Sequence, residues 1–146
     1  MVQHRLQPLL APRSVAIVGA SPKTESFGWS SYRALVDYGF EGEVHLINPG
    51  YDEIDGRPCY PDFAAIGKPI EHAMLNVANT RLEGLFEATI AAGIPAATIF
   101  ASGYLEGDPD LVTRMRARAA ETGLMICGGN GSGFYNRAEN VQISLG

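Results

Sequence analysis

The residues of this sequence that could do chemistry are mostly small and polar, and the first group follows a short apolar run. In the segment GASPKTESFGW, Gly19 permits a tight turn, and Ser21, Lys23 and Ser26 supply hydrogen-bond donors. A helix that begins near Gly28 adds unsatisfied backbone amides and the positive end of its dipole. These features favour a phosphate or pyrophosphate ligand. The alternative is a polar loop of a Rossmann-like fold with nothing bound.

A second group lies in HLINPG, where Asn48 precedes Pro49. A dinucleotide-binding fold carries Asp or Glu at the corresponding place to bind a ribose hydroxyl, after a G-x-G-x-x-G motif. Asn48 can hydrogen-bond a ribose or a base edge, but asparagine before proline also simply begins a turn. The missing carboxylate and the missing glycine motif argue against an NAD(H)-binding domain.

Three further segments follow apolar runs: NVANT, FASGYLEG and CGGNGSGFYN. The small residues of the first two leave a shallow track for a long, thin ligand, or they only allow close helix packing. The glycines of the third are costly in backbone entropy unless special dihedrals or close approach require them. Its Asn130 and Ser132 could direct donors at the reactive end of a ligand. The alternative is a flexible exit from the last strand.

No complete catalytic set accompanies these segments. His4, His45 and His72 fall in an N-terminal arm, a strand interior and a strand start, where surface or packing roles are expected. Cys59 and Cys127 lack the spacing of a metal site or a disulfide framework. We therefore predict a binding surface with no catalytic residues and no metal site.

The elements that position these segments alternate along the whole chain. Short, continuous apolar runs are typical of parallel strands covered on both faces, and they occupy residues 15–18, 44–47, 73–77, 97–100 and 124–126. Helical patterns lie between the runs, and each of the three ends at a glycine: Gly39, Gly93 and Gly123. Thr80 and Glu83 predict a capping box, and Asp108 before Pro109 predicts the start of another helix.

Residues 48–70 interrupt this alternation as a turn-rich connection with one short helix near residues 61–66. The overall order predicts an α/β fold, a Rossmann-like doubly wound parallel sheet with helices on both faces, in a single domain. In such sheets ligands bind at the carboxyl ends of the strands. The polar and glycine-rich segments fall at those ends.

Composition narrows the class of protein. The chain has 146 residues, 46% of them hydrophobic, which suits one globular domain. Its net charge is −5, so the chain lacks the excess of basic residues that is typical of a nucleic-acid-binding protein. The N-terminal residues lack the apolar stretch of a signal peptide, and the cysteine usage fits a reducing compartment. We expect a cytoplasmic protein that binds neither nucleic acid nor membrane.

Several motifs together resemble the N-terminal CoA-binding domain of NDP-forming acyl-CoA synthetases, which are related to the α subunit of succinyl-CoA synthetase. The motifs are RSVAIVGAS followed by Ser26 and Gly28, GFEGEVHLINPGYDEIDG, YPDFAAI and GNGSGFYN. The sequence departs from the family pattern at four positions. Gly50 stands where lysine often follows N-P, Ala78 replaces a common proline, and Gly129 and Gly131 replace the proline and cysteine of the last loop.

The resemblance implies coenzyme A as the ligand. The pyrophosphate would lie near Gly19 and Gly28, the adenosine near Asn48, and the thiol towards the last loop. The implied CoA-binding residues are Gly19, Ala20, Ser21, Lys23, Ser26, Gly28, Asn48, Pro49, Val77, Ala78, Asn79, Ala101, Ser102, Gly103, Gly128 and Asn130.

The resemblance also implies that catalysis requires other parts of a ligase. The phosphohistidine and the nucleotide-binding site belong to further ligase domains or to a subunit, so this chain alone would bind without catalysing. We expect residues 1–12 to form an N-terminal arm, residues 13–136 the CoA-binding domain, and residues 137–146 the truncated start of a following segment. A stand-alone CoA-binding protein is the alternative, and an NAD(H)-binding Rossmann domain is a weaker one.

Overall fold

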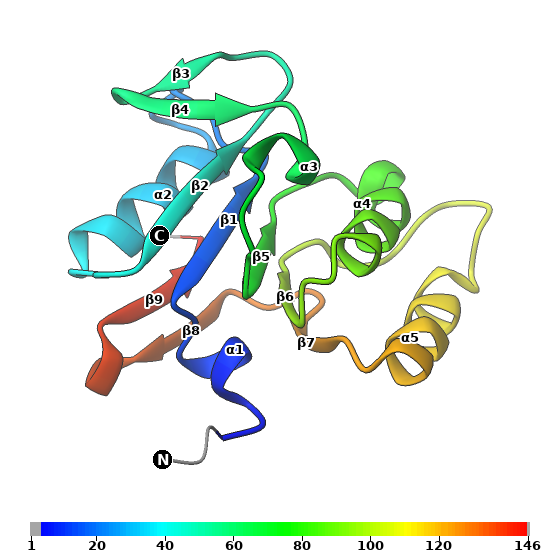
Figure 1. Cartoon of the computed structure of the whole chain (residues 1–146). Coiled ribbons are helices and arrows are strands. Elements are labelled where there is room, and N and C mark those ends of the chain that lie inside the picture. The colour runs from blue at the N-terminus through cyan, green and yellow to red at the C-terminus, as the bar shows by residue number, and fades with distance from the viewer. Residues whose placement is uncertain (1–3, 146) are drawn as a thin grey trace.

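A mostly parallel β-sheet forms the centre of the molecule (Figure 1). The computed structural model describes residues 4–145. Five of the parallel strands of the sheet are β1 (Ser14–Val18), β2 (Glu43–Ile47), β5 (His72–Leu75), β6 (Ala96–Ile99) and β7 (Met125–Gly128). The order β3-β4-β2-β1-β5-β6-β7 places β1 in the middle, between β2 and β5. The predicted doubly wound α/β fold is confirmed.

Helices cover both faces of the sheet. Helix α2 (Phe27–Asp37) lies on one face, where Tyr32 and Leu35 pack with Ile17 of β1. Helices α4 (Asn79–Ala91) and α5 (Leu111–Thr122) lie on the other, where Leu82 and Leu111 belong to a second core cluster. The apolar runs are buried because each central strand contributes side chains to both clusters.

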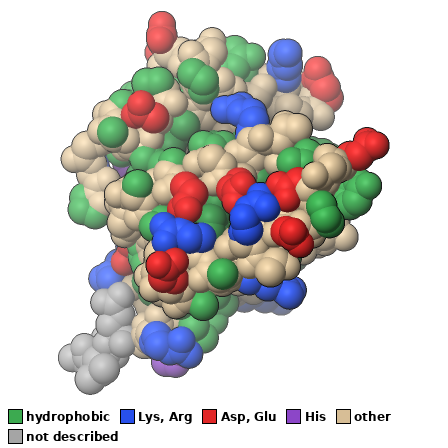
Figure 2. All heavy atoms as spheres, turned by 90° about the vertical axis from the view of Figure 1, so that its right-hand side faces the viewer, with side chains coloured by type: hydrophobic (Ala, Val, Ile, Leu, Met, Phe, Trp, Pro, Cys, Tyr) green, Lys and Arg blue, Asp and Glu red, His purple; other side chains and the backbone are tan. Residues whose placement is uncertain are grey.

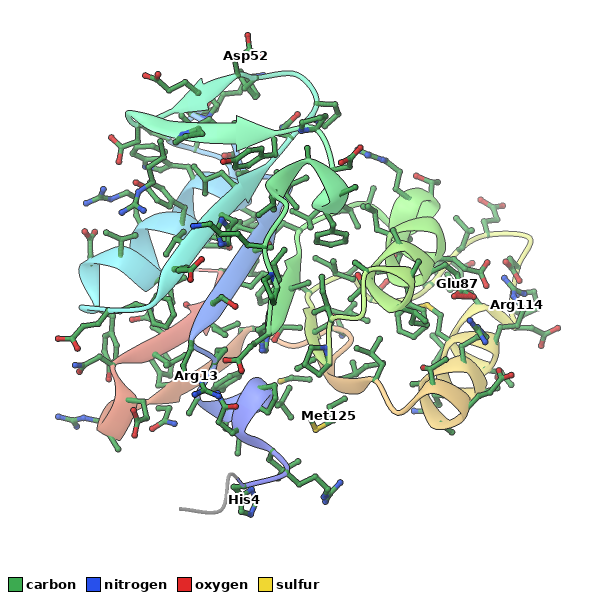
Figure 3. The ribbon with its side chains drawn as sticks, in the orientation of Figure 1. His4, Arg13, Asp52, Glu87, Arg114 and Met125 are labelled. Carbon is green, nitrogen blue, oxygen red and sulfur yellow. The ribbon has the colours of Figure 1, made fainter. Side chains whose placement is uncertain are left out.

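The two predicted helix starts on the second face are wrong. The N-cap of α4 is Ala78 and that of α5 is Asp110, and neither side chain makes a capping hydrogen bond. Glu83 and Asp108 instead accept hydrogen bonds from Arg114, whose nitrogens lie 2.6–2.9 Å from their oxygens. Figure 2 shows the acidic and basic side chains gathered on this face, and Figure 3 shows Arg114 at α5. Pairing with Arg114 takes the place of the predicted capping, between helices at Glu83 and within the start of α5 at Asp108.

The connection after β2 contains more structure than predicted. A hairpin of β3 (Glu53–Ile54) and β4 (Arg57–Tyr60) extends the sheet, and β4 runs parallel to β2. Tyr32 of α2 donates a 2.6 Å hydrogen bond to Asp55 in the hairpin turn. The predicted short helix is present as α3 (Phe63–Ile66), whose first turn is capped by Asp62.

The C-terminal residues fold back onto the α2 face. Strand β8 (Gly133–Asn136) and the 3-10 turn η1 (Arg137–Glu139) lead into β9 (Val141–Ser144), which pairs antiparallel with β8. Val141 and Ile143 are fully buried in the cluster that contains Tyr32. Residues 141–144 thus complete the core beneath α2. That residues 137–146 begin a following segment stays a prediction, and residue 146 lies outside the described residues.

Residues 4–12 of the predicted N-terminal arm pack against the amino ends of the strands, and residues 1–3 lie outside the described residues. Helix α1 (Gln7–Leu10) brings Gln7 and Arg13 to Glu71, and Arg13 is labelled beside α1 in Figure 3. Pro8 O accepts a 3.1 Å hydrogen bond from Nδ1 of the buried His72. Among residues 4–145, no helix combines the length and apolarity needed to cross a membrane.

Candidate functional site

Three connected clefts run along the carboxyl ends of the parallel strands. The first, of about 560 Å³, lies between Gly19, Gly28, Asn79 and Ala101. The second, of about 110 Å³, shares Gly19 and Val77 with the first and is lined by Asn48 and Pro49. The third, of about 230 Å³, shares Ala101 with the first and reaches Gly128 of β7. Shared lining residues therefore join five strand ends into one track.

Most of the sequence-predicted site residues line this track, and four do not. The twelve that line it are Gly19, Ser26, Gly28, Asn48, Pro49, Val77, Ala78, Asn79, Ala101, Ser102, Gly103 and Gly128. Ala20 is 1% exposed and belongs to the core beneath α2. Ser21 Oγ accepts a 3.1 Å hydrogen bond from Lys23 N, and Asn130 N donates to Ala101 O. These four support the loops whose other residues face the clefts.

Glycines 19 and 28 let two loops touch at the start of the track. Gly19 has φ +83°, and a Cβ there would lie 2.1 Å from Asn76 O. A Cβ on Gly28 would lie 2.0 Å from Gly19 O. Both glycines are therefore required by backbone packing against neighbouring segments, rather than only by the approach of a ligand.

The N-terminus of α2 presents free donors to the first cleft. Ser26 Oγ caps the helix by accepting from Trp29 N at 3.1 Å, and it donates to Lys23 O at 2.7 Å. The amides of Phe27 and Gly28 donate to no acceptor within residues 4–145. Free amides at the positive end of an 11-residue helix suit an anion.

Asn76 adds a donor that sequence analysis did not single out. Its Nδ2 is the one buried side-chain nitrogen or oxygen in residues 4–145 that has no hydrogen-bond partner. Its Oδ1 accepts from Ser31 Oγ at 3.4 Å, and Asn76 lines the first cleft. An unsatisfied buried amide is costly, so an acceptor supplied by a ligand would stabilise it. The available signal was its position as the first residue after β5.

Asn48 fixes the end of β2 to the loop after β1. Its Nδ2 donates to Ala20 O at 2.8 Å, and its Oδ1 accepts from Gly50 N at 2.9 Å. Both polar atoms of the side chain are thus occupied by backbone. The sequence left open whether Asn48 binds a ligand or begins a turn, and these two bonds show that it holds the turn.

Asn79 likewise joins two segments, between the first and third clefts. Its Oδ1 accepts from Gly103 N at 2.9 Å, and its Nδ2 donates to Ser102 Oγ at 3.1 Å. These bonds fix the loop after β6 to the start of α4. Gly128 has φ +115° and a Cβ there would lie 2.1 Å from Ile99 O, so the last loop also packs closely against its neighbour.

Within residues 4–145, neither Cys127 nor His72 supplies an activated side chain to the track. Burial raises the pKa of the Cys127 thiol, the cysteine closest in sequence to the last loop, so the thiol stays protonated at neutral pH. His72 lies in the core, between Pro8 O and Thr98 Oγ1, rather than at the strand ends. The arrangement can bind an extended, partly anionic ligand.

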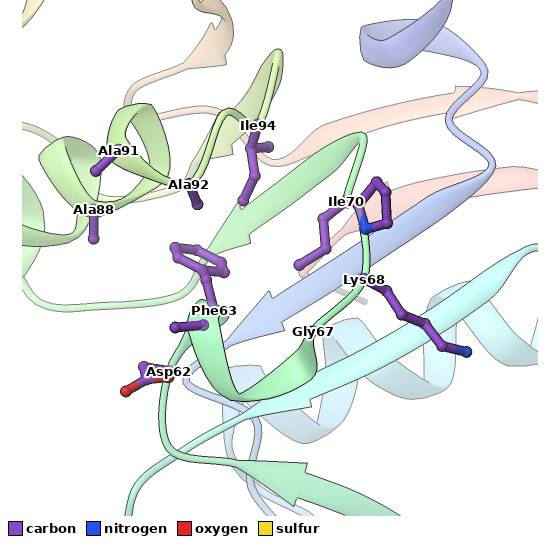
Figure 4. Close-up of a pocket in the computed structure, with 11 residues that line it drawn as sticks. Asp62, Phe63, Gly67, Lys68, Ile70, Ala88, Ala91, Ala92 and Ile94 are labelled. Atoms are coloured by element: carbon purple, nitrogen blue, oxygen red, sulfur yellow. The ribbon is translucent and has the colours of Figure 1, made fainter.

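A separate groove of about 720 Å³ lies between α3 and α4. Figure 4 shows Phe63 and Ile94 facing its interior, while the Lys68 amine points away. Ile70 and Ile94 precede β5 and β6, so the groove opens towards the amino ends of these strands. Its walls are mainly apolar and offer few donors for a polar ligand.

Comparison with known proteins gives consistent relationships. The model of a family described as the CoA binding domain matches residues 13–136. An ADP-forming acetate–CoA ligase of Methanocaldococcus jannaschii is 31% identical over 97% of this chain and 20% of its own length. Subunit alpha of an ADP-forming acetate–CoA ligase I of Pyrococcus furiosus is 30% identical over 97% of this chain and 32% of its own length.

A solved structure shares both sequence and fold with the chain. It is acetyl-coenzyme A synthetase 1 of Candidatus Korarchaeum cryptofilum, in complex with phosphate and ADP. The two superpose with a TM-score of 0.89 at 30% identity, over 97% of this chain and 31% of that one. The chain thus spans between a fifth and a third of the length of these relatives.

Proposed function

Because the chain belongs to the family of CoA binding domains and is homologous to NDP-forming acyl-CoA synthetases, we propose that it binds CoA along the carboxyl ends of its strands. The observation that carries the proposal is the continuous track of three clefts with unpartnered donors at its centre. CoA is a long molecule whose central pyrophosphate joins a neutral pantetheine arm to an adenosine that carries a 3′-phosphate. A polar centre flanked by two further clefts matches that distribution.

The donors of the first cleft fit the pyrophosphate. Phe27 N and Gly28 N stand free at the helix end, and Asn76 Nδ2 is buried without an acceptor. An anion in this cleft would satisfy all three and would benefit from the dipole of α2. Ser21 and Lys23 support the loop that carries these donors. Local amides account for anion binding even though the chain carries a net charge of −5.

The other two clefts would take the arms of CoA. The adenosine end would lie against Asn48 and Pro49 in the second cleft. The pantetheine arm would pass between the loop after β5 and the loop after β6, which Asn79 holds together. The thiol end would reach the third cleft near Gly128 and Asn130.

This chain would bind and orient, while other parts of a ligase perform the chemistry. Bound CoA supplies a nucleophilic thiol for acyl transfer. The chain contributes loops that hold the molecule extended and directed towards β7. We place the phosphohistidine and the nucleotide-binding site of the reaction on further domains or on a partner subunit. The acetate–CoA ligase I of Pyrococcus furiosus carries a separately named subunit alpha, which is compatible with such a division.

Calorimetric titration of the 146-residue chain with CoA and with NAD tests this proposal. We expect saturable binding of CoA and weaker or no binding of NAD, since no carboxylate replaces Asn48 at the ribose position. Binding of NAD with no response to CoA would refute the proposal while leaving the fold unchanged. In the same titration the variant Gly39→Ala, which is changed at the far end of α2 and outside all three clefts, should bind CoA as the parent does.

A further inference from the structure

A positively charged side chain lines the second cleft. Arg81, in the first turn of α4, lines this cleft together with Asn48 and Pro49. Its side chain makes no hydrogen bond or ion pair with any residue in the described range 4–145. Its position on the helix directs it to the β2 side of the track, away from the free amides of α2.

Most arginines near the sheet are engaged elsewhere. Arg33 pairs with Asp37 and Asp55, and Arg57 donates to Tyr32 Oη at 3.0 Å. Arg114 and Arg118 are each held by two carboxylates on the α4–α5 face. Arg81 and Arg116 differ from these arginines: they line the second and third clefts, and neither side chain makes a hydrogen bond or ion pair within residues 4–145. Arg81, which is exposed, is the one that lines the second cleft.

The backbone of the second cleft offers few free donors. Asn48 N donates to Tyr60 O, Tyr51 N donates to Asn48 O, and Gly50 N donates to the Asn48 side chain. Pro49 has no amide hydrogen. The turn that lines the cleft has therefore used its donors internally. An anionic group bound beside this turn would need its donors from other residues of the cleft, and a charged side chain would also neutralise it.

Two charged side chains line the second cleft, Asp62 and Arg81. The Oδ1 of Asp62 accepts from Ala65 N as the cap of α3. Arg81 is thus the one positively charged residue among those that line this cleft. A guanidinium presents several donors in a planar fork that matches a phosphate.

We infer that Arg81 binds the 3′-phosphate of CoA and makes the site prefer CoA to dephospho-CoA. The inference rests on the proposed function and assigns one further contact within it. The pyrophosphate is not the partner, because the free amides and Asn76 lie in the first cleft on the other side of Gly19. The 3′-phosphate belongs to the adenosine end, which we place in the same cleft as Arg81.

Titration of the chain with CoA and dephospho-CoA tests the inference, using Arg81→Gln, Arg81→Lys and the control Arg137→Gln. Arg137 is an exposed residue of η1 outside the clefts. For Arg81→Gln we expect affinity for CoA to fall about tenfold, as for loss of one charged hydrogen-bonded contact, with dephospho-CoA unaffected. Arg81→Lys should keep part of the preference, because it keeps the charge but loses the fork. Arg137→Gln should match the parent.

Each other outcome overturns the inference in a recognisable way. Unchanged CoA affinity in Arg81→Gln would show that the guanidinium makes no contact. An equal loss for both ligands would assign Arg81 to the pyrophosphate or to the fold of the cleft. If the parent binds CoA but does not distinguish it from dephospho-CoA, this inference fails and the proposed function stands. If the parent does not bind CoA at all, both fail.

Discussion

The two ends of the same parallel strands differ in how their polar groups are used. At the amino end, Glu71 Oε1 accepts from Arg13 N at 2.7 Å and from Gln7 Nε2 at 3.1 Å, and α1 packs over the strands. Burial raises the pKa of the Glu71 carboxyl, but these hydrogen bonds and the Arg13 guanidinium lower it more, so the net pKa lies below its usual range. At the carboxyl end, Phe27 N, Gly28 N and Asn76 Nδ2 have no protein partner.

The direction of the helices explains this difference. In a βα unit each helix begins at the carboxyl end of the sheet, so its free amides and positive dipole face that edge. The helices end at the opposite edge, where an αL glycine such as Gly123 closes α5. The arm then covers what remains at the amino end. Donors for a ligand are consequently available at the carboxyl end.

The largest expected effect comes from adding a methyl group at the carboxyl edge. Gly19→Ala puts a Cβ 2.1 Å from Asn76 O in a left-handed backbone conformation. We expect a loss of about 3 kcal/mol or more in unfolding free energy, because the conformation costs about 1–2 kcal/mol and the displaced backbone adds to it. CoA binding should be lost at concentrations that saturate the parent.

The matched variant is Gly39→Ala, at φ +93° with no heavy atom within 4 Å of the added Cβ. It carries the conformational cost alone, about 1–2 kcal/mol, and should bind CoA as the parent does. Urea unfolding and calorimetry of both variants measure the difference. Equal behaviour of the two would mean that the contact between Gly19 and Asn76 does not matter.

The next largest effect is a dependence of stability on pH, which arises from His72 at the amino end of β5. Because Pro8 O can only accept, the proton of neutral His72 lies on Nδ1, and Nε2 accepts from Thr98 Oγ1. Complete burial lowers the pKa of His72 from 6.5 to about 4. Between these values the unfolded chain takes up a proton that the folded chain does not. Stability should therefore fall as pH decreases from 6.5 to 4, by about 3 kcal/mol in total.

Urea unfolding at several pH values, for the parent and for His72→Gln, isolates this contribution. The variant should be less stable at pH 7 but should lack this part of the pH dependence. A parallel decline in both proteins would contradict the pKa assigned to His72. Since His72 lies away from the clefts, CoA affinity of the folded variant at pH 7 should equal that of the parent.

The smallest effect is expected from the cap of α2. Ser26→Ala removes the acceptor for Trp29 N and should cost about 1 kcal/mol of stability. CoA affinity should fall a few-fold, because the helix end that presents Phe27 N and Gly28 N becomes less ordered. Ser30→Ala, one turn further along α2, is the control and should leave both quantities near the parent values. Thermal unfolding and calorimetric titration compare the two variants. An unchanged CoA affinity in Ser26→Ala would show that the N-terminus of α2 does not contribute to CoA binding.

The amino-acid pattern was sufficient to predict the sheet and the edge at which the site lies. The five apolar runs became β1, β2, β5, β6 and β7, because short apolar runs bounded by turn residues are typical of parallel strands covered by helices. Gly39, Gly93 and Gly123 follow the helices as predicted. Since parallel strands end at a common edge, the segments that follow the runs also had to lie together.

Which polar groups are used and which remain free depends on contacts between distant segments. Glu83 and Asp108 match local capping patterns, but Arg114 of α5 pairs with both, with Glu83 on the neighbouring α4 and with Asp108 in the loop before its own helix. Strands β3, β4, β8 and β9 were not predicted, because none of them contains the continuous apolar run that marks the other strands. The free donor of Asn76 and the unpaired Arg81 likewise depend on which neighbours the fold supplies. A sequence pattern records what a side chain could bind, whereas the packed structure determines which of its partners are already present.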